Sequence, residues 1–121
     1  MLLTDLEVQQ TIAKAQAAFP NLTDWQYNNE KNGEYFGFSL WGQCSLHPED
    51  LMVRYCFITL DTYKEEWYGH LTIGQPYYLW SSADVGDAYL VDTAPCKTCE
   101  DAMSVLKGEI ANLCRIFSIN E

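Results

Sequence analysis

The chain has 121 residues, of which 48% are hydrophobic and 14% are aromatic, and its formal net charge at pH 7 is −10. This length suits one domain over residues 1–121, because two smaller domains would each bury too little surface to be stable, and the apolar content excludes a disordered chain. The negative charge repels the phosphates of nucleic acids and anionic membranes, which argues against both as partners and favours a basic protein.

The N-terminal residues contain no basic region and no long apolar core of the kind that a signal peptide needs. Apolar runs elsewhere are only a few residues long, far short of the roughly 20 that span a bilayer. The chain has an odd number of cysteines, namely Cys44, Cys56, Cys96, Cys99 and Cys114. We therefore expect a cytoplasmic protein whose thiols are reduced.

The first predicted element is a helix that starts after Thr4 and ends near Phe19. Thr4 and Glu7 have the spacing of a capping box, in which each side chain bonds the backbone N–H of the other residue. Apolar residues then recur at helical spacing, and Pro20 cannot continue the helix. The apolar positions are Val8, Ile12, Ala15 and Phe19.

From Leu22 to Thr93 the apolar period changes from helical to alternating, which predicts strands. In the segment 66–73, Trp67 and Leu71 fall on the inner side, while Tyr68 and His70 fall on the outer side. Short connections favour antiparallel neighbours. The expected strands are a short one around residues 25–27, then 35–43, 52–60, 66–73, 77–81 and 88–91.

The last predicted element is a helix over residues 98–117, with Thr98 as its N-cap. One apolar stripe runs along it, formed by Cys99, Ala102, Met103, Leu106, Ile110, Leu113, Cys114 and Phe117. The expected fold is α+β: an N-terminal helix, an antiparallel meander of five or six strands and a C-terminal helix, with the helices packed on the sheet.

Aromatic side chains on the outer side of the strands suggest a binding surface. If both helices cover one side of the sheet, the other side presents Tyr and Trp rings edged by carboxylates, which suits a protein interface. We therefore expect a small non-enzymatic module of the adaptor, inhibitor or immunity type that binds a basic protein. A homodimer, or a helix covering this face, is the alternative. The candidate binding residues are Trp41, Tyr68, Tyr78, Trp80, Asp84 and Asp87.

A second hypothesis is a zinc-stabilised domain. Cys44 and His47 form one pair with two intervening residues, and Cys96 and Cys99 form another, so together they supply four N/S ligands for a tetrahedral site. The spacing between the pairs is longer than in compact zinc fingers. Burial of Cys99 within the stripe of the last helix is the competing explanation, and it needs no cofactor.

Catalysis is a third hypothesis. The Cys-x-x-Cys segment precedes a helix, but a thioredoxin-like fold needs further strands after it, and only one helix follows here. An enzyme would instead show a pocket that gathers His70, carboxylates and a Tyr.

Overall fold

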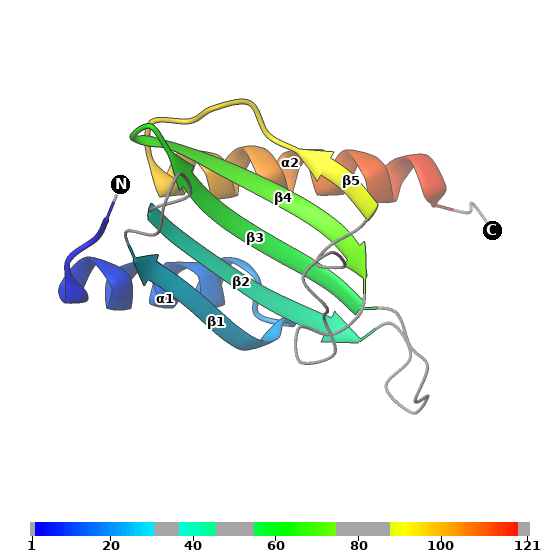
Figure 1. Ribbon diagram of the computed structural model, residues 1–121. Coiled ribbons are helices and arrows are strands. Elements are labelled where there is room, and N and C mark those ends of the chain that lie inside the picture. The colour runs from blue at the N-terminus through cyan, green and yellow to red at the C-terminus, as the bar shows by residue number, and fades with distance from the viewer. Residues whose placement is uncertain (1, 31–36, 46–54, 75–87, 119–121) are drawn as a thin grey trace.

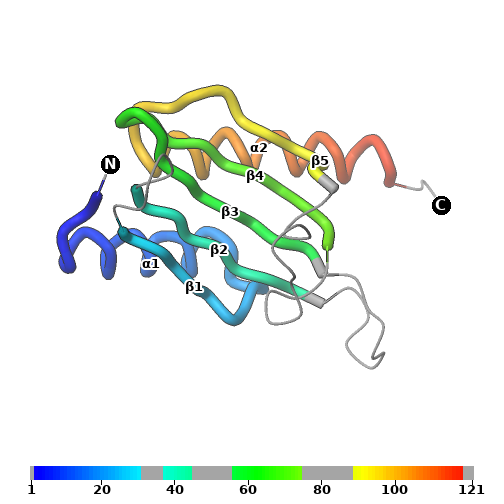
Figure 2. The backbone as a smooth tube through the Cα atoms, viewed as in Figure 1, coloured from blue at the N-terminus to red at the C-terminus, as the bar shows by residue number. Residues whose placement is uncertain are grey.

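The computed structural model describes residues 2–30, 37–45, 55–74 and 88–118. Its elements are α1 (Asp5–Ala18), β1 (Thr23–Glu30), β2 (Gly37–Ser45), β3 (Tyr55–Tyr63), β4 (Glu66–Gly74), β5 (Ala88–Asp92) and α2 (Cys99–Phe117). The strands form one antiparallel sheet in the order β1-β2-β3-β4-β5, so the predicted meander between two helices is confirmed (Figures 1 and 2). The expected strand at 77–81 lies outside the described residues.

Both helices lie on the same face of the sheet (Figure 1). The capping box predicted at the start of α1 is present, since Thr4 Oγ1 accepts from the Glu7 N–H and the Glu7 carboxylate accepts from the Thr4 N–H. Thr98 caps α2 by accepting from the Asp101 N–H. These caps satisfy backbone donors that have no partner within the helix and fix where each helix begins.

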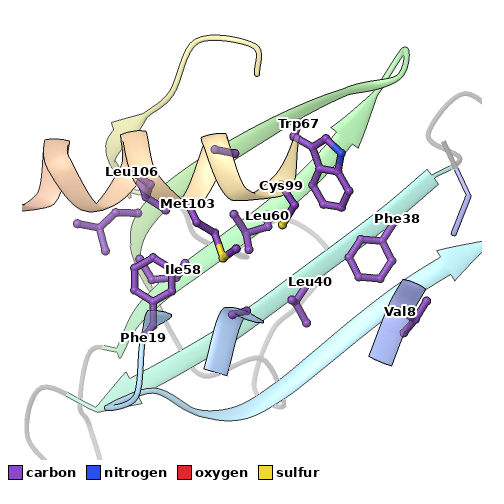
Figure 3. Packing of buried hydrophobic residues seen from close by; sticks show 13 residues of the cluster. Val8, Phe19, Phe38, Leu40, Ile58, Leu60, Trp67, Cys99, Met103 and Leu106 are labelled. Atoms are coloured by element: carbon purple, nitrogen blue, oxygen red, sulfur yellow. The ribbon is translucent and has the colours of Figure 1, made fainter. Parts of the chain in front are cut away.

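The core lies between the helices and this inner face of the sheet (Figure 3). The apolar stripes of the helices meet alternate residues of the central strands, as the sequence predicts. The buried apolar residues include Val8, Ala15, Phe19, Phe38, Leu40, Ile58, Leu60, Trp67, Ala102, Met103 and Leu106.

Gly69 lets α2 approach β4 closely. A Cβ atom at this position would lie 3.2 Å from a methyl group of Leu106 and 3.3 Å from Thr93. Leu106 is fully buried against this part of the sheet. The absence of a side chain at residue 69 therefore sets how deeply the helix packs.

The structure differs from the sequence-based expectation at the ends of two elements. β3 runs to Tyr63 rather than to residue 60, and a two-residue turn at Lys64 and Glu65 connects it to β4. Both turn residues have positive φ, as type I′ hairpin turns require, although neither is Gly or Asn. Cys114 and Phe117 were predicted in the buried stripe of α2, but they are exposed.

Replacing Gly42 tests the packing of β1 against β2. A Cβ atom there would lie 2.7 Å from ring carbons of Trp25, which is half-buried against the core. We expect Gly42→Ala to lower the free energy of unfolding by about 1–3 kcal/mol, because the ring must move out of its packed position. Denaturant unfolding measures the change.

Gly108→Ala is the matched control. This glycine is exposed within α2, and nothing lies within 4 Å of the added atom. We expect the control to raise stability by about 0.5–1 kcal/mol, because Ala is the better helix former. Equal effects of the two substitutions would contradict the proposed packing.

Candidate functional site

The face of the sheet opposite the helices, called the open face here, carries two neighbouring rows of side chains. Strand register places Asn28, Ser39, Asp61 and Tyr68 side by side across β1 to β4. Directly paired residues of antiparallel strands point to the same face, so each row forms a band of neighbours. The adjacent row contains Gln26, Trp41, Thr59, His70 and Asp92 across β1 to β5.

Apart from His70, the charged strand residues that the structure describes on this face are carboxylates, and Lys64 in the β3–β4 turn lies at its edge, with Nζ 5.4 Å from the centroid of the Tyr63 ring. Alternation along the strands places four carboxylates there, and none of the five lysines and arginines in the described part of the chain occupies a strand position on this face. On the helices and the residues leading into α2, by contrast, five carboxylates are accompanied by four cations. The carboxylates at paired strand positions are Glu30, Asp61, Glu66 and Asp92. Asp24 adds a fifth, because its Oδ2 accepts from Gln43 Nε2 on this face at 3.0 Å.

His70 lies between two of these carboxylates. Its Nδ1 is 2.6 Å from Asp92 Oδ1 on β5, and its Nε2 is 3.3 Å from Asp61 Oδ2 on β3. The rings of His70 and Tyr89 meet edge to face, with their centroids 5.6 Å apart. The imidazole side chain is only 19% exposed. Its two contacts connect the edge strand β5 with the central strand β3.

The surroundings of His70 favour its charged form. Burial alone would lower the pKa of His70, but hydrogen bonds to Asp61 and Asp92 and the negative charge of both groups outweigh it and raise the pKa above its ordinary value. A protonated imidazole donates through both ring nitrogens, which matches a carboxylate on each side.

A hollow of about 420 Å³ opens beside this cluster. Its floor comes from the row that contains Asp61, and His70 borders it from the adjacent row. Ser39 Oγ donates to Asp61 Oδ1 at 2.7 Å, which holds the carboxylate in place. The lining residues are Asn28, Gly37, Ser39, Asp61, Thr62, Tyr63, Tyr68 and His70.

The hollow brings together the groups expected of an enzyme site, but His70 and Ser39 are both engaged with carboxylates. Both nitrogens of His70 face carboxylates, so neither has a free lone pair to accept a proton from a substrate. Ser39 bonds Asp61 instead of the imidazole, so the histidine does not activate its hydroxyl. The imidazole also separates the carboxylates, and the described residues contain no cluster of three groups that could hold a metal ion.

Two of the six predicted binding residues belong to this region. Tyr68 lines the hollow, and Trp41 lies in the row that contains His70, so both are on the open face as the alternation predicts. The remaining four predicted binding residues, Tyr78, Trp80, Asp84 and Asp87, lie outside the described residues.

The open face is not equally accessible along its length. Gln43, Phe57 and Thr72 belong to it, but all three are buried. Trp41 is half-buried, and its indole N–H is buried without a hydrogen-bond partner among the residues that the structure describes. On the central strands β2 to β4, the more accessible side chains of this face therefore lie toward the β3–β4 turn, around the hollow, whereas Thr23 and Tyr89 are exposed on the edge strands.

The proposed zinc ligands are spread along the sheet. Cys44 pairs with Cys56, which pairs with Ile73 at one end of β4, whereas Cys96 pairs with Trp67 at the other end. Six residues of strand separate these positions, or about 20 Å, whereas ligands of one zinc ion lie within about 4 Å of each other. The fold therefore does not bring Cys44 close to Cys96. His47 lies outside the described residues.

Cys99 has the packing role that its place in the α2 stripe predicts. It is 6% exposed, and burial raises the pKa of its thiol to about 12. A thiol with this pKa is not the reactive thiolate of a redox motif, although it stands at the N-terminus of a helix.

Sequence reasoning missed Ser39, Asp61 and Asp92 as parts of the site. Asp61 lies beyond the predicted end of its strand, so its neighbours could not be inferred. A bulge at Leu71/Thr72 shifts the pairing of β5 and places Asp92 opposite His70. The one feature of the sequence that pointed to this site was the alternation in segment 66–73, which places His70 on the outer side of its strand.

Comparison with known proteins finds no protein family, no curated sequence and no solved structure that matches the chain. Within the described ranges, neither helix is long and apolar enough to cross a membrane.

Replacing His70 tests the ionic cluster. Its folded-state pKa lies above that of the unfolded chain, so protonated His70 stabilises the fold fully below about pH 6.5, and this contribution is lost as pH rises through the folded-state pKa. We expect His70→Asn to lower the free energy of unfolding more at about pH 5.5 than at about pH 9. Denaturant unfolding of both proteins at both pH values measures the difference. The same loss at both pH values would contradict the cluster.

Proposed function

We propose that this protein is a small non-enzymatic binding module, of the adaptor, inhibitor or immunity type, that receives a basic protein partner on the open face. The observation that carries this proposal is the segregation of charge. The described strands place five carboxylates on this face, four at paired positions and Asp24 through its bond to Gln43, and no lysine or arginine stands at a strand position there, although Lys64 lies at its edge in the β3–β4 turn. A face with this potential attracts cationic surfaces and speeds their encounter with it.

Aromatic groups add to the suitability of this face. Tyr68 is half-buried at the hollow, while Tyr63 and Tyr89 are 49% and 61% exposed on either side of the site. Tyrosines bury a large area at low cost in side-chain entropy and carry a hydroxyl for hydrogen bonds, which explains their enrichment at interfaces. Both helices that the structure describes lie on the other face, so neither of them covers these strand positions (Figure 1).

A basic partner fits this face better than a second copy of the chain. A two-fold dimer brings the same patch of both subunits together. Here it would place carboxylates against carboxylates between two molecules that each carry a net charge of −10. Repulsion of this kind costs free energy that a partner rich in Lys or Arg avoids.

The two alternatives have less support. Catalysis by His70 requires at least one carboxylate to leave the ring, because both nitrogens are engaged. The zinc hypothesis stays a prediction, and metal analysis of protein purified without chelator is its direct test.

Substitution of Tyr68 tests the proposed interface. The tagged protein captures its partner from native lysate, and the affinity for the purified partner is then measured for each variant. We expect Tyr68→Ala to weaken binding about tenfold or more, because a half-buried aromatic at the centre of an interface contributes strongly. Raising the salt concentration from about 0.05 M to about 0.5 M should weaken binding of the wild type as well.

Phe117→Ala is the control, because Phe117 is an exposed aromatic residue on α2. We expect it to change the affinity by less than about twofold, as neutral contacts do. If neither Tyr68→Ala nor added salt changes the affinity, or if Phe117→Ala lowers it, the partner does not bind the open face.

A further inference from the structure

We propose that the hollow at Asp61 binds the guanidinium group of an arginine from the partner, and that the proton on His70 competes with this arginine. This inference rests on the proposed function and names the chemistry of the contact. It follows from the contacts of Asp61, the groups that line the hollow and the charges around His70.

Asp61 retains capacity for a cation. One of its oxygens accepts from Ser39, and the other faces His70. A carboxylate offers about four acceptor positions, so these two contacts leave room for a pair of N–H donors. The side chain is 35% exposed at the hollow, so a group that enters from solvent can reach it.

The walls of the hollow favour a planar cation. Tyr68 lies directly beside Asp61 across the β3–β4 pair, and the Asn28 side chain borders the same space. A guanidinium group is planar, so it can stack on a tyrosine ring while the N–H groups at its edge bond a carboxylate. An ammonium group has no such plane and cannot make both contacts in this way. Lys64 Nζ already lies 5.4 Å from the centroid of the Tyr63 ring, which leaves Tyr68 as the available ring.

His70 couples this site to pH. The groups that face its ring are Asp61 from β3 and Asp92 and Tyr89 from β5, and the only charges among them are the two carboxylates. Protonated His70 and a bound arginine would share the charge of Asp61, so each weakens the binding of the other. By reciprocity, loss of the His70 proton strengthens arginine binding, and arginine binding releases the proton.

NMR titration with N-acetyl-arginine N-methylamide tests this inference. The chain has only two histidines, so the His70 Cε1–H signal is assigned by its presence in His47→Asn and its absence in His70→Asn. We expect the probe to shift this signal in a saturable manner and to move the His70 titration to lower pH. The affinity should be at least about fivefold higher at pH 8.5 than at pH 5.5.

Variants and a second probe give the controls. Asp61→Asn should abolish binding, while Glu109→Gln, at an exposed carboxylate on α2, should leave it unchanged. His70→Asn should bind the probe with the same affinity at both pH values. N-acetyl-lysine N-methylamide should bind more weakly than the arginine probe, which separates guanidinium recognition from attraction of any cation.

Several results would overturn the inference: no saturable shift, equal wild-type affinity at the two pH values, the same pH dependence in His70→Asn, or equal binding of both probes. If Asp61→Asn does not fold, the comparison of probes and the His70→Asn titration still decide. A partner that loses affinity with Tyr68→Ala while the arginine probe fails would retain the proposed function and remove only this contact.

Discussion

Both helices lie on one face of the sheet, and this arrangement decides which strand side chains are buried in the core (Figure 1). α2 packs on β4 because Gly69 leaves room for Leu106, and α1 reaches the same core through Val8, Ala15 and Phe19. Each helix has one apolar stripe, so each buries that stripe against the sheet. Neither of the two described helices lies on the opposite face, where the strand residues provide the side chains available for contacts (Figure 1).

Charged residues are distributed differently on the helix side and on the open face of the sheet. The helix side mixes carboxylates with lysines and an arginine, including the Lys14–Glu100 ion pair between α1 and the start of α2. On the open face the charged residues at described strand positions are carboxylates and His70, and Lys64 of the β3–β4 turn is a further cation at its edge. By bridging Asp61 and Asp92, His70 both joins β5 to the sheet and sets the charge beside the hollow. In the proposed function, structural support and recognition would both depend on this ionic contact.

The order of elements and the burial pattern follow from the sequence, whereas the site depends on register. Alternation predicts that Trp67 and Leu71 point inward and that Tyr68 and His70 point outward, because the side-chain period of a strand is fixed. Strand pairing has no comparable local signal here. The turn at Lys64 and Glu65 lacks the Gly or Asn that marks a type I′ hairpin, and the bulge opposite Leu71/Thr72 shifts β5 without a glycine. The neighbours of His70 are set by these two features, so Asp61 and Asp92 could be found only in the structure.

Paramagnetic surface mapping measures whether the face opposite the helices attracts cations. Amide line broadening is compared for a small cationic nitroxide and a neutral nitroxide of the same size. We expect the ratio of cationic to neutral broadening to be larger at residues around the hollow, such as Ser39, Asp61 and Tyr68, than at exposed residues of α2 such as Glu109. Equal ratios on both faces would contradict this expectation, because the open face would then have no electrostatic preference that a basic partner could use.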